Sequence, residues 1–432
     1  MLWGAIWKCC PLMIYQLWDI DGKRLNMKDN SRQRPHVLVL TSTFPRWEND
    51  TEPAFVFELS RRLADEFEIT VISPRTPGSK EREGMAGLCV IRFPYFFNRW
   101  EKLAMHGGGI LNKLKSNPLY YLMIPFFLLG QMRAVVGLLR SERFDLIHAH
   151  WLIPQGFVAA LSLLIARKKI PLLCTSHGGD LFALKGKGLQ RLKRWVINKS
   201  AALTVVSKAM RKTVVAMGID PDKVEVIPMG VDLKGLFTPD PCVQRKTDEL
   251  LFVGRLVEVK GLQILLEAMT KVIARHPNIH LIVAGAGPLE SELRASAKKL
   301  DIADHVDFRG MVMQSKLPTL YRQATIAVFP FVVTKSGVQE GFGLVVVEAM
   351  GCGCPIIAGD LPAIHDTVVH KENGLLFESG NSQALADAII RMLADPDLCA
   401  KLAGEGRRRV VQKFDWEIVA EKYGKIYQRL MD

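Results

Sequence analysis

From Val37 onward, short runs of β-branched and aliphatic residues alternate with stretches that have helical periodicity. This alternation is typical of a parallel sheet whose strands are joined by crossover helices. The predicted strands form two series: 37–42, 69–73, 89–93, 146–149, 172–176, 203–206 and 224–227, then 250–254, 279–284, 306–309, 326–329 and 355–358. A chain of 432 residues exceeds what one hydrophobic core usually serves. We therefore predict an α/β protein of two Rossmann-like, doubly wound domains.

The polar, turn-rich stretch 238–248 lies between the two series and marks the junction of the domains. We place the first domain at 35–240 and the second at 241–413. Helices are expected between the strands, for example at 54–67, 154–166 and 208–216.

Residues 1–34 fit neither series. The stretch 1–20 is apolar and rich in tryptophan, but Lys8 and Asp19 interrupt it. It lacks the positive region and the small-residue cleavage site of a signal peptide, and it is too interrupted for a transmembrane helix. We expect a poorly ordered extension, with Met27 as an alternative start. The other interpretation is a membrane-surface anchor.

The positive charge of the chain is concentrated in one part of it. The formal net charge is +13, and residues 101–200 hold 15 lysines and arginines against 4 acidic residues. Such a patch suits nucleic acid, an anionic membrane surface or an anionic acceptor, and charge alone does not choose among them.

Two helical stretches in this basic part bear on a membrane contact. The apolar run 118–130 ends where Gln131 and Arg133 follow, which suits a buried or interfacial helix better than a membrane span. The stretch 184–199 interleaves leucines with six cations and carries Trp195, as a basic amphipathic helix does. It either contacts a membrane surface or packs its leucines on its own domain.

The sequence gives little support for a metal site. The eight cysteines are scattered without a CxxC pair, so we expect neither zinc nor a disulfide framework, and we expect Cys352 and Cys354 to be small core residues. Asp-x-Asp pairs occur at 19/21, 220/222 and 395/397. The last two are Asp-Pro-Asp, which is turn chemistry at the start of a helix.

Two glycine-containing loops end the first two strands of the second series. In the loop from Gly254 to Gly261, Arg255 and Lys260 can neutralise a diphosphate at the carboxyl end of a strand, where ligands bind in such sheets. The loop Ala284-Gly285-Ala-Gly287-Pro288 is a tight turn that lets a ligand approach the backbone. It lacks the third glycine and the downstream acid of a dinucleotide-binding fingerprint.

Glu340 and Glu348 lie eight positions apart across the start of a predicted helix. We expect Gly341, Phe342 and Gly343 to present free backbone N–H groups at this helix N-terminus, which attracts phosphate. At about 1.5 Å rise per residue, the two carboxylates lie on the order of 10 Å apart, roughly the distance from a sugar ring to a ribose across a diphosphate. The spacing indicates a nucleotide-sugar site with one carboxylate at each end.

Polar residues also follow two neighbouring strands of the first series. His148, His150 and Trp151 come at the end of one strand, and His177 and Asp180 come after the next. His177 stands beside two glycines and points to where an opposing domain must face; the alternative is a structural histidine. We expect His148 and His150 to project to opposite faces of their strand, which excludes a shared metal ion.

Taken together, these motifs resemble those of the retaining glycosyltransferases of family 4, which have the GT-B architecture of two facing Rossmann-like domains with a cleft between them. The resemblance covers roughly residues 36–430. It rests on Gly254-Arg255 with Lys260-Gly261, on Gly285-Ala-Gly287-Pro288, and on Glu340 to Glu348 followed by Ala349-Met-Gly-Cys-Gly-Cys-Pro355. Each motif alone is unspecific, whereas the set is specific.

The resemblance implies a role for each residue. Glu340 contacts the hydroxyls of the donor sugar, and Glu348 holds the ribose. Arg255 and Lys260 hold the diphosphate, while His177 approaches the sugar from the other domain. The implied catalytic set is Glu340, His177, Arg255 and Lys260. The donor-binding set is Gly254, Arg255, Lys260, Gly285, Gly287, Glu340, Gly341, Phe342, Gly343, Leu344 and Glu348. A C-terminal helix, 414–432, is implied to cross back to the first domain.

One loop departs from the family pattern. The usual Gly-Gly loop after the first strand is replaced by the sequence from Thr43 to Pro53, which includes Phe-Pro-Arg46. A similar Phe-Pro-Arg and Asp-Thr pattern occurs in some family members, so the fold assignment stands. The residues expected on the acceptor side are Asp180, His150, Trp151 and Arg46.

The implied reaction is transfer of a hexose from a nucleoside diphosphate sugar to a lipid-linked or polysaccharide acceptor, with retention of the anomeric configuration. No metal or cofactor is expected, because Arg255, Lys260 and the helix N-terminus oppose the charge of the leaving diphosphate. We expect a cytoplasmic protein at the inner face of a membrane, with an anionic membrane surface but no nucleic acid as a partner. The alternatives are an epimerase or an inverting transferase on the same fold, and a non-catalytic nucleotide-sugar-binding protein at a membrane surface.

Overall fold

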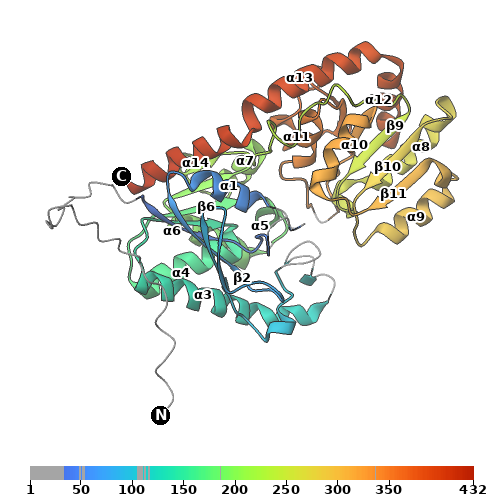
Figure 1. The fold of residues 1–432 in the computed structure, drawn as a ribbon. Coiled ribbons are helices and arrows are strands. Elements are labelled where there is room, and N and C mark those ends of the chain that lie inside the picture. The colour runs from blue at the N-terminus through green and yellow to red at the C-terminus, as the bar shows by residue number, and fades with distance from the viewer. Residues whose placement is uncertain are drawn as a thin grey trace, which may run out of the picture. The chain divides into compact units, whose positions relative to one another are not determined.

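A computed structural model describes residues 34–47, 50, 54–104, 110, 113–114, 117–184, 186–335 and 337–432. Residues 35–432 form one compact unit (Figure 1). The expectations for the N-terminal extension, including Met27, Asp19 and Asp21, lie outside the described residues. Within the compact unit the predicted α/β class and the two Rossmann-like sheets are present.

The first sheet has eight strands in the order β3-β4-β2-β1-β5-β6-β7-β8. Their bounds are β1 His36–Leu40, β2 Glu68–Pro74, β3 Arg82–Met85, β4 Leu88–Phe93, β5 Leu146–His150, β6 Leu172–Ser176, β7 Ala202–Val205 and β8 Val224–Val226. All pairs are parallel except β3 with β4. The strand β3 was not predicted, because it is a short polar edge strand without an apolar run. Its turn residues Ala86 and Gly87 both have positive φ, as a tight hairpin requires.

Helices cover both faces of this sheet because neighbouring residues of a strand point to opposite sides. Leu38 and Leu40 of β1 belong to one core, with residues of α3, α4, α6 and α7. Val37 and Val39 belong to another, with residues of α1 and the C-terminal helix α14. The helices are α1 Phe55–Leu63, α3 Ile124–Ser141, α4 Phe157–Ala166, α5 Gly179–Phe182, α6 Lys187–Lys199 and α7 Lys208–Ala216.

The second sheet has six parallel strands in the order β11-β10-β9-β12-β13-β14. The strands are β9 Glu249–Val253, β10 His280–Ala284, β11 Val306–Gly310, β12 Ile326–Phe329, β13 Ile356–Gly359 and β14 Leu375–Phe377. The helices are α8 Leu262–Arg275, α9 Glu290–Lys299, α10 Leu317–Gln323, α11 Leu344–Gly351, α12 Ser382–Ala394 and α13 Pro396–Phe414. The three-residue strand β14 was not predicted, since it is too short for a periodic signal.

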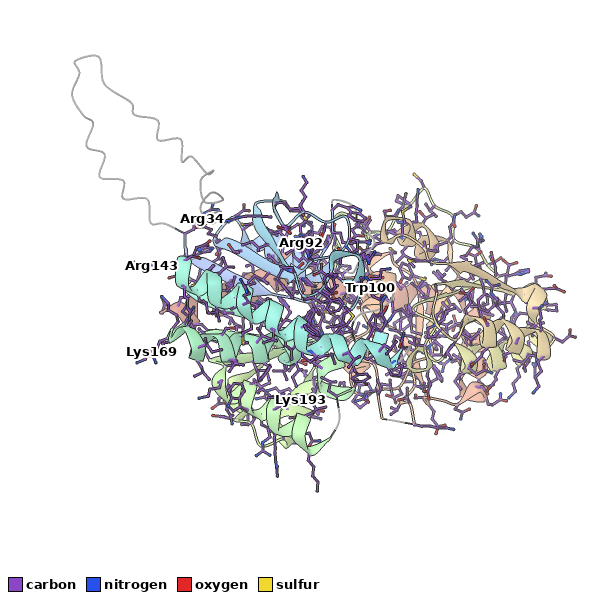
Figure 2. All side chains as sticks on the ribbon, turned by 90° about the horizontal axis from the view of Figure 1, so that it is seen from below. Arg34, Arg92, Trp100, Arg143, Lys169 and Lys193 are labelled. Carbon is purple, nitrogen blue, oxygen red and sulfur yellow. The ribbon has the colours of Figure 1, made fainter. Side chains whose placement is uncertain are left out.

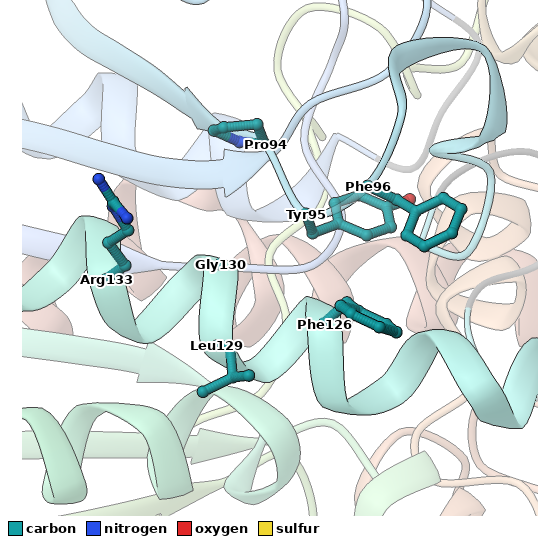
Figure 3. A pocket seen from close by; sticks show the side chains of 7 residues that line it. All are labelled: Pro94, Tyr95, Phe96, Phe126, Leu129, Gly130 and Arg133. Atoms are coloured by element: carbon teal, nitrogen blue, oxygen red, sulfur yellow. The ribbon is translucent and has the colours of Figure 1, made fainter.

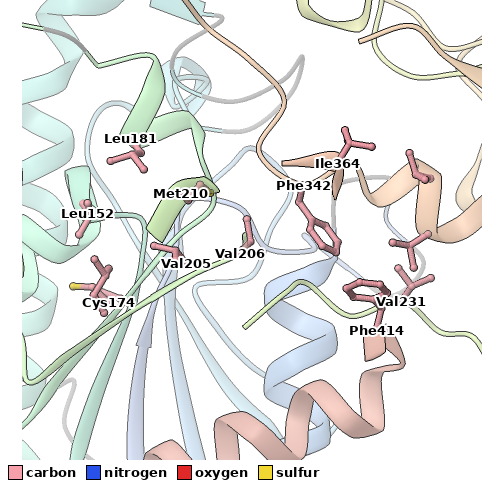
Figure 4. Packing of buried hydrophobic residues seen from close by; sticks show 14 of the residues in the cluster. Leu152, Cys174, Leu181, Val205, Val206, Met210, Val231, Phe342, Ile364 and Phe414 are labelled. Atoms are coloured by element: carbon pink, nitrogen blue, oxygen red, sulfur yellow. The ribbon is translucent and has the colours of Figure 1, made fainter. Parts of the chain in front are cut away.

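Two consecutive helices, α13 and the C-terminal helix α14, return the chain from the second half to the first. Asp415 separates them and caps the start of α14. Asp415 accepts hydrogen bonds from the backbone N–H groups of Glu417 and Leu233, and α14 (Trp416–Met431) begins there. A β-bridge joins Asp415 to Val231. The helix α14 then packs against α1 and β5 of the first sheet. Figure 4 shows the apolar packing near this break, where the rings of Phe342 and Phe414 lie 5.5 Å apart.

Both Asp-Pro-Asp sequences start helices, as predicted. Asp220 accepts a hydrogen bond from the N–H of Asp222, and Asp395 accepts one from Leu398 at the start of α13. Cys352 and Cys354 are buried, in agreement with their prediction as small core residues.

The predicted basic amphipathic segment forms α6, and its apolar side faces the domain. Trp195 packs on Phe157 with 6.0 Å between ring centroids, and the two residues after it are buried. Lys193 is also buried, and its Nζ donates to the carbonyl oxygens of Leu181 and Leu184 at 2.8 and 2.7 Å. The structure therefore favours the interpretation in which this helix packs on its own domain.

Within the described residues, one helical stretch, Pro118–Ser141, is long and apolar enough to cross a membrane by length and composition. It consists of the short helix η2 (Pro118–Met123) and α3. Phe127, Val135 and Leu139 of α3 are buried in the first core, and α3 contacts α4, β2 and β4. These contacts make α3 part of the packing of the first domain.

Candidate functional site

An ion pair at the N-terminus of α11 forms the centre of the candidate site. Lys260, at the end of the short helix η5 (Glu258–Lys260), donates from Nζ to Oε2 of Glu340 at 2.7 Å. The ammonium group also lies 4.9 Å from the ring centroid of Phe331. Burial by itself raises the pKa of Glu340, but Lys260 and the backbone N–H groups of Phe342 and Gly341 outweigh it, and the pKa is lowered. Glu340 is therefore a carboxylate at neutral pH.

The backbone N–H groups at this helix start are not free, contrary to the prediction. Oε1 of Glu340 accepts hydrogen bonds from Gly341, Phe342 and Gly343 at 3.1, 3.4 and 3.2 Å. The physical reason is that the positive end of the helix attracts any nearby anion, and Glu340 is the nearest. Leu344 begins the helix, and the side chain of Phe342 is buried, so Phe342 offers only its backbone to a ligand.

Glu348 has a different environment, about one turn after the start of α11. It is buried, and its Oε2 accepts a hydrogen bond from the hydroxyl of Tyr321 at 3.1 Å. Burial raises the pKa of Glu348 to about 7, although Tyr321 and Lys260 oppose the shift. Tyr321 could not be predicted from the sequence, because it lies on α10 and no local pattern connects it to Glu348.

The glycines of the two loops after β9 and β10 make room for backbone. A Cβ on Gly285 would lie 1.9 Å from the carbonyl oxygen of Gly254, and a Cβ on Gly287 would lie 2.4 Å from that of Leu256. The sequence predicts that these glycines admit a ligand, whereas the structure shows that they admit the adjacent loop. They hold the loop that carries Arg255, an exposed residue at the carboxyl end of β9.

The loop of the first half that carries His177 touches the glycine loop before α11. A Cβ on Gly341 would lie 3.3 Å from the carbonyl oxygen of His177 and 3.5 Å from Cα of Gly178. Gly178 has φ of +99°, a conformation that side chains rarely adopt. His177 and Glu340 therefore belong to loops in contact, although 163 positions separate them in the sequence.

His177 pairs with a second histidine from the neighbouring strand. Its Nε2 lies 3.0 Å from Nδ1 of His150, and the two rings stack at 5.3 Å. Trp151 and Phe55 flank His177 at 5.0 and 4.7 Å between ring centroids. Burial lowers the pKa of His177 to about 3 and that of His150 well below its ordinary value, so both rings are neutral. Two buried ring nitrogens, Nδ1 of His177 and Nε2 of His150, have no hydrogen-bond partner among the described residues.

The expectation that His148 and His150 point to opposite faces is wrong. Residues two apart on a strand share a face, and the ring centroids lie 4.1 Å apart. Each nitrogen of His148 has a protein partner, the hydroxyls of Tyr427 and Thr175, both at 2.7 Å. In the described part of the chain no group of three or more His, Cys, Asp or Glu side chains is arranged to hold a metal ion.

Two of the four predicted acceptor-side residues have internal roles. Asp180 is buried, and its carboxylate accepts hydrogen bonds from the N–H of Leu152 at 2.7 Å and the hydroxyl of Ser176 at 2.8 Å. It thus joins the loops after β5 and β6 rather than facing an acceptor. Arg46 donates from Nε to Asp50 at 2.7 Å, so its charge is paired within its own loop.

Of the other two, His150 is buried against His177, whereas the partly exposed Trp151 retains a position suited to contact with substrate. Trp151 has φ of 75°, an uncommon value for a non-glycine residue and one often found at functional sites. The buried Arg92, which was not predicted as a site residue, supports the loop after β1 by donating to the carbonyl oxygens of Pro45 and Arg46. The sequence gives no sign of this role, because an arginine within a strand is normally predicted to be exposed.

Known proteins match both halves of the chain. The family described as Glycosyltransferase Family 4 matches residues 54–234, and the family described as Glycosyl transferases group 1 matches residues 242–409. The D-inositol 3-phosphate glycosyltransferase of Jonesia denitrificans is 30% identical over 331 residues, which cover 68% of this chain and 75% of that protein.

Two further proteins extend this comparison. The phosphatidyl-myo-inositol mannosyltransferase of Mycolicibacterium smegmatis is 28% identical over 381 residues, which cover 86% of this chain and 88% of that protein. Sucrose-phosphate synthase from Thermosynechococcus elongatus has a similar fold, with a TM-score of 0.71 and 22% identity over 92% of this chain and 99% of that one.

Proposed function

This chain belongs to the family 4 glycosyltransferases, and on that premise we propose that it transfers a hexose from a nucleoside diphosphate sugar to a lipid-linked acceptor with retention of configuration. One observation carries the proposal. The ion pair of Lys260 and Glu340 lies at the N-terminus of α11, and the loop of His177 contacts the glycine next to that pair. A cation, a carboxylate, a helix N-terminus and a neutral imidazole are thus gathered where two domains meet.

When the donor binds, its diphosphate would replace Glu340 as the partner of Lys260. A diphosphate carries more negative charge than Glu340 and competes for Lys260 and for the three N–H groups of the helix start. Arg255 at the end of β9 would supply a second cation. Once displaced, the carboxylate of Glu340 is available to the hydroxyls of the sugar. The two cations and the helix N-terminus then stabilise the leaving diphosphate, so we propose that no metal ion is required.

Glu348 would hold the ribose of the nucleotide. A carboxylate accepts hydrogen bonds from two vicinal hydroxyls more strongly than a carboxylic acid does. Because the pKa of Glu348 is about 7 in the structure, ligand binding would have to ionise it in part at neutral pH. The hydroxyl of Tyr321 positions the carboxyl group from the opposite side.

For the transfer itself, we propose that the acceptor hydroxyl attacks the anomeric carbon from the face that the diphosphate leaves. The bond from that carbon to the phosphate oxygen breaks, and its electron pair goes to the diphosphate. The acceptor oxygen forms the new bond, and its proton passes to the departing phosphate. His177 is neutral because of its burial, so it can orient a sugar hydroxyl without attracting the diphosphate to the wrong side.

The acceptor is proposed from charge and from the relatives. The names of the two relatives above refer to an inositol phosphate and to a phosphatidylinositol, both of which are anionic. Residues 101–200 of this chain hold 15 lysines and arginines against 4 acidic residues. A negatively charged, lipid-linked acceptor at the cytoplasmic face of a membrane fits this excess, and a polysaccharide acceptor is the second candidate.

The decisive experiment has two stages. Thermal unfolding is first measured with UDP, GDP, ADP and their hexoses, since a ligand at about 100 times its Kd stabilises by roughly 2.7 kcal/mol. The preferred radiolabelled donor is then incubated with phosphatidylinositol or with a soluble glycan, and the anomeric configuration of the product is determined by NMR. An inverted anomer, an epimerised donor without transfer, or binding without turnover would each refute the proposal and identify one of its rivals.

A further inference from the structure

We propose that the exposed apolar surface around η2 and the first turns of α3 is a docking site for a bilayer that contains anionic lipid. This lipid-docking surface consists of Phe97, Trp100, Leu119, Tyr121, Leu122, Phe126 and Leu129, each of which is at least half exposed. Monomeric soluble proteins rarely expose large apolar side chains in such a group. The other large apolar residues that are equally exposed, such as Met311, belong to separate parts of the chain.

The opposite side of α3, away from this surface, packs against the first domain. Phe127, Gln131, Val135 and Leu139 face the domain and are fully or almost fully buried. In Figure 2, α3 runs across the face turned to the viewer, with Trp100 near its beginning and Arg143 beyond its end. The exposed residues are therefore presented on a rigid support, and the helix can lie on a bilayer without leaving its domain.

The surface includes a shallow hollow. It lies between the strand-to-loop segment Pro94–Phe96 and the residues Phe126, Leu129, Gly130 and Arg133 of α3, and its volume is about 310 Å³ (Figure 3). Gly130 lets α3 pack directly against this segment, since a Cβ there would lie 2.5 Å from the carbonyl oxygen of Pro94. An apolar wall with one arginine suits a lipid chain near its anionic headgroup.

The charge pattern around the surface favours an anionic bilayer as the partner. Residues 94–141 include six lysines and arginines but only one acidic residue, Glu101. Glu101 is buried, where it accepts hydrogen bonds from Arg75 and from the N–H groups of Tyr95 and Phe96. The exposed cations Arg99, Lys102 and Arg133 therefore have no nearby exposed carboxylate in this segment. A second copy of the chain would bring like charges together, whereas an anionic bilayer neutralises them.

The position of the surface adds a functional consequence. The segment 94–97 follows the carboxyl end of β4, and His150 and His177 lie at the carboxyl ends of β5 and β6. In a parallel sheet these ends share one edge. A bilayer docked here would lie on the side of the first domain from which a lipid acceptor must enter. This consequence rests on the proposed function, whereas the binding of lipid does not.

The test uses the full chain and vesicles, with neither donor nor acceptor present, so its outcome is independent of the proposed reaction. Co-sedimentation is measured with phosphatidylcholine vesicles and with vesicles that contain about 30% phosphatidylglycerol. We expect binding to the anionic vesicles that falls severalfold between low and high salt, because salt screens the charges. Replacing Leu119, Leu122 and Phe126 together by serine should weaken binding at least tenfold.

The matched control replaces three equally exposed apolar residues elsewhere, Leu164, Met311 and Met313, by serine. It should bind as the wild type does. A second control changes the exposed cations Lys187, Arg191 and Arg194 of α6 to glutamine and spares the buried Lys193. If this second variant loses binding and the first triple variant keeps it, α6 is the contact and the proposal is overturned.

One further measurement does not depend on a serine variant that folds. Brominated phosphatidylcholine and phosphatidylglycerol should quench the tryptophan fluorescence of the wild type more than that of Trp100→Phe, because Trp100 is exposed on the surface. Equal quenching in the two proteins would exclude contact at this site. A concentration-dependent dimer in light scattering that Leu122→Ser abolishes, without vesicle binding, would assign the surface to a second copy instead.

Discussion

The two sides of the candidate site differ in the charge of their side chains. On the side of the second sheet, Lys260 and Glu340 are charged and hold each other at the start of a helix. On the side of the first sheet, His150 and His177 are neutral, stacked and enclosed by aromatic rings. The charged side can exchange its internal partners for a ligand anion, whereas the neutral side cannot compete for that anion. Under the proposed function, this difference would direct the diphosphate to the second domain and leave the first for the sugar and the acceptor.

The largest effect is expected on the charged side. Lys260→Ala removes the cation that faces the leaving diphosphate, and kcat should fall by about 10² to 10³. The matched control is Lys298→Ala, which removes an exposed lysine from α9. Steady-state kinetics with the preferred donor measures both. If Lys260→Ala retains the kcat of the wild type, the diphosphate does not bind at this ion pair.

Glu348→Ala should weaken nucleotide binding more than Glu340→Ala does. The ribose contact exists before and after transfer, while the sugar contact matters most as the bond breaks. Loss of a hydrogen-bonded charged group costs about 1.5 to 3 kcal/mol, roughly ten- to a hundredfold in Kd. Calorimetric titration with UDP and GDP measures the loss, with Glu292→Ala on α9 as control. Equal losses in both variants would contradict this division of roles.

The raised pKa of Glu348 predicts a pH dependence of stability. A carboxyl group with a folded-state pKa of about 7 stabilises the fold fully below its unfolded pKa of about 4.5, and this stabilisation is lost as pH rises through about 7. The free energy of unfolding of the wild type relative to Glu348→Gln should therefore fall between pH 5 and 8, by at most about 3 kcal/mol. Urea unfolding at each pH measures it. A difference that does not change with pH would mean that Glu348 is already ionised at pH 5.

On the neutral side, His150→Phe keeps an aromatic ring but removes the nitrogen that meets Nε2 of His177. The imidazole of His177 then lacks its partner, and we expect kcat to fall about tenfold, the equivalent of one lost hydrogen bond of about 1.4 kcal/mol. The Kd of the donor should stay within about twofold. His280→Phe, at an exposed position on β10, is the control. A loss in donor affinity as large as the loss in kcat would place His150 in the donor site instead.

The smallest effect is expected from chelation. If the two cations and the helix N-terminus suffice for the leaving group, activity in excess EDTA should equal activity without it. Assays before and after treatment, with Mg²⁺ and Mn²⁺ added back, measure this. A strict requirement for either ion would refute the metal-free mechanism.

Much of the fold follows from local patterns. Buried parallel strands are continuous apolar runs, so all twelve predicted strands needed at most two residues of correction at an end, and the loops that carry Arg255, Lys260 and Glu340 were located from their glycines. Local patterns failed where strands were short or polar, as in β3 and β14. They also failed for Asp180, because a polar residue in a loop looks the same whether it faces a ligand or a neighbouring backbone.

By itself, the sequence determined the α/β class, the repeated strand series, the family resemblance and the positions of Glu340 before the start of α11 and Glu348 within it, because each depends on residues close together in the chain. Only the tertiary structure decided that Glu340 takes up the helix N–H groups, that Tyr321 meets Glu348, and that His150 meets His177. It also decided that α6 turns its apolar side inward, whereas α3 has an apolar side that remains exposed. Amphipathic periodicity shows that a helix has an apolar side, but which partner covers that side depends on packing between distant segments.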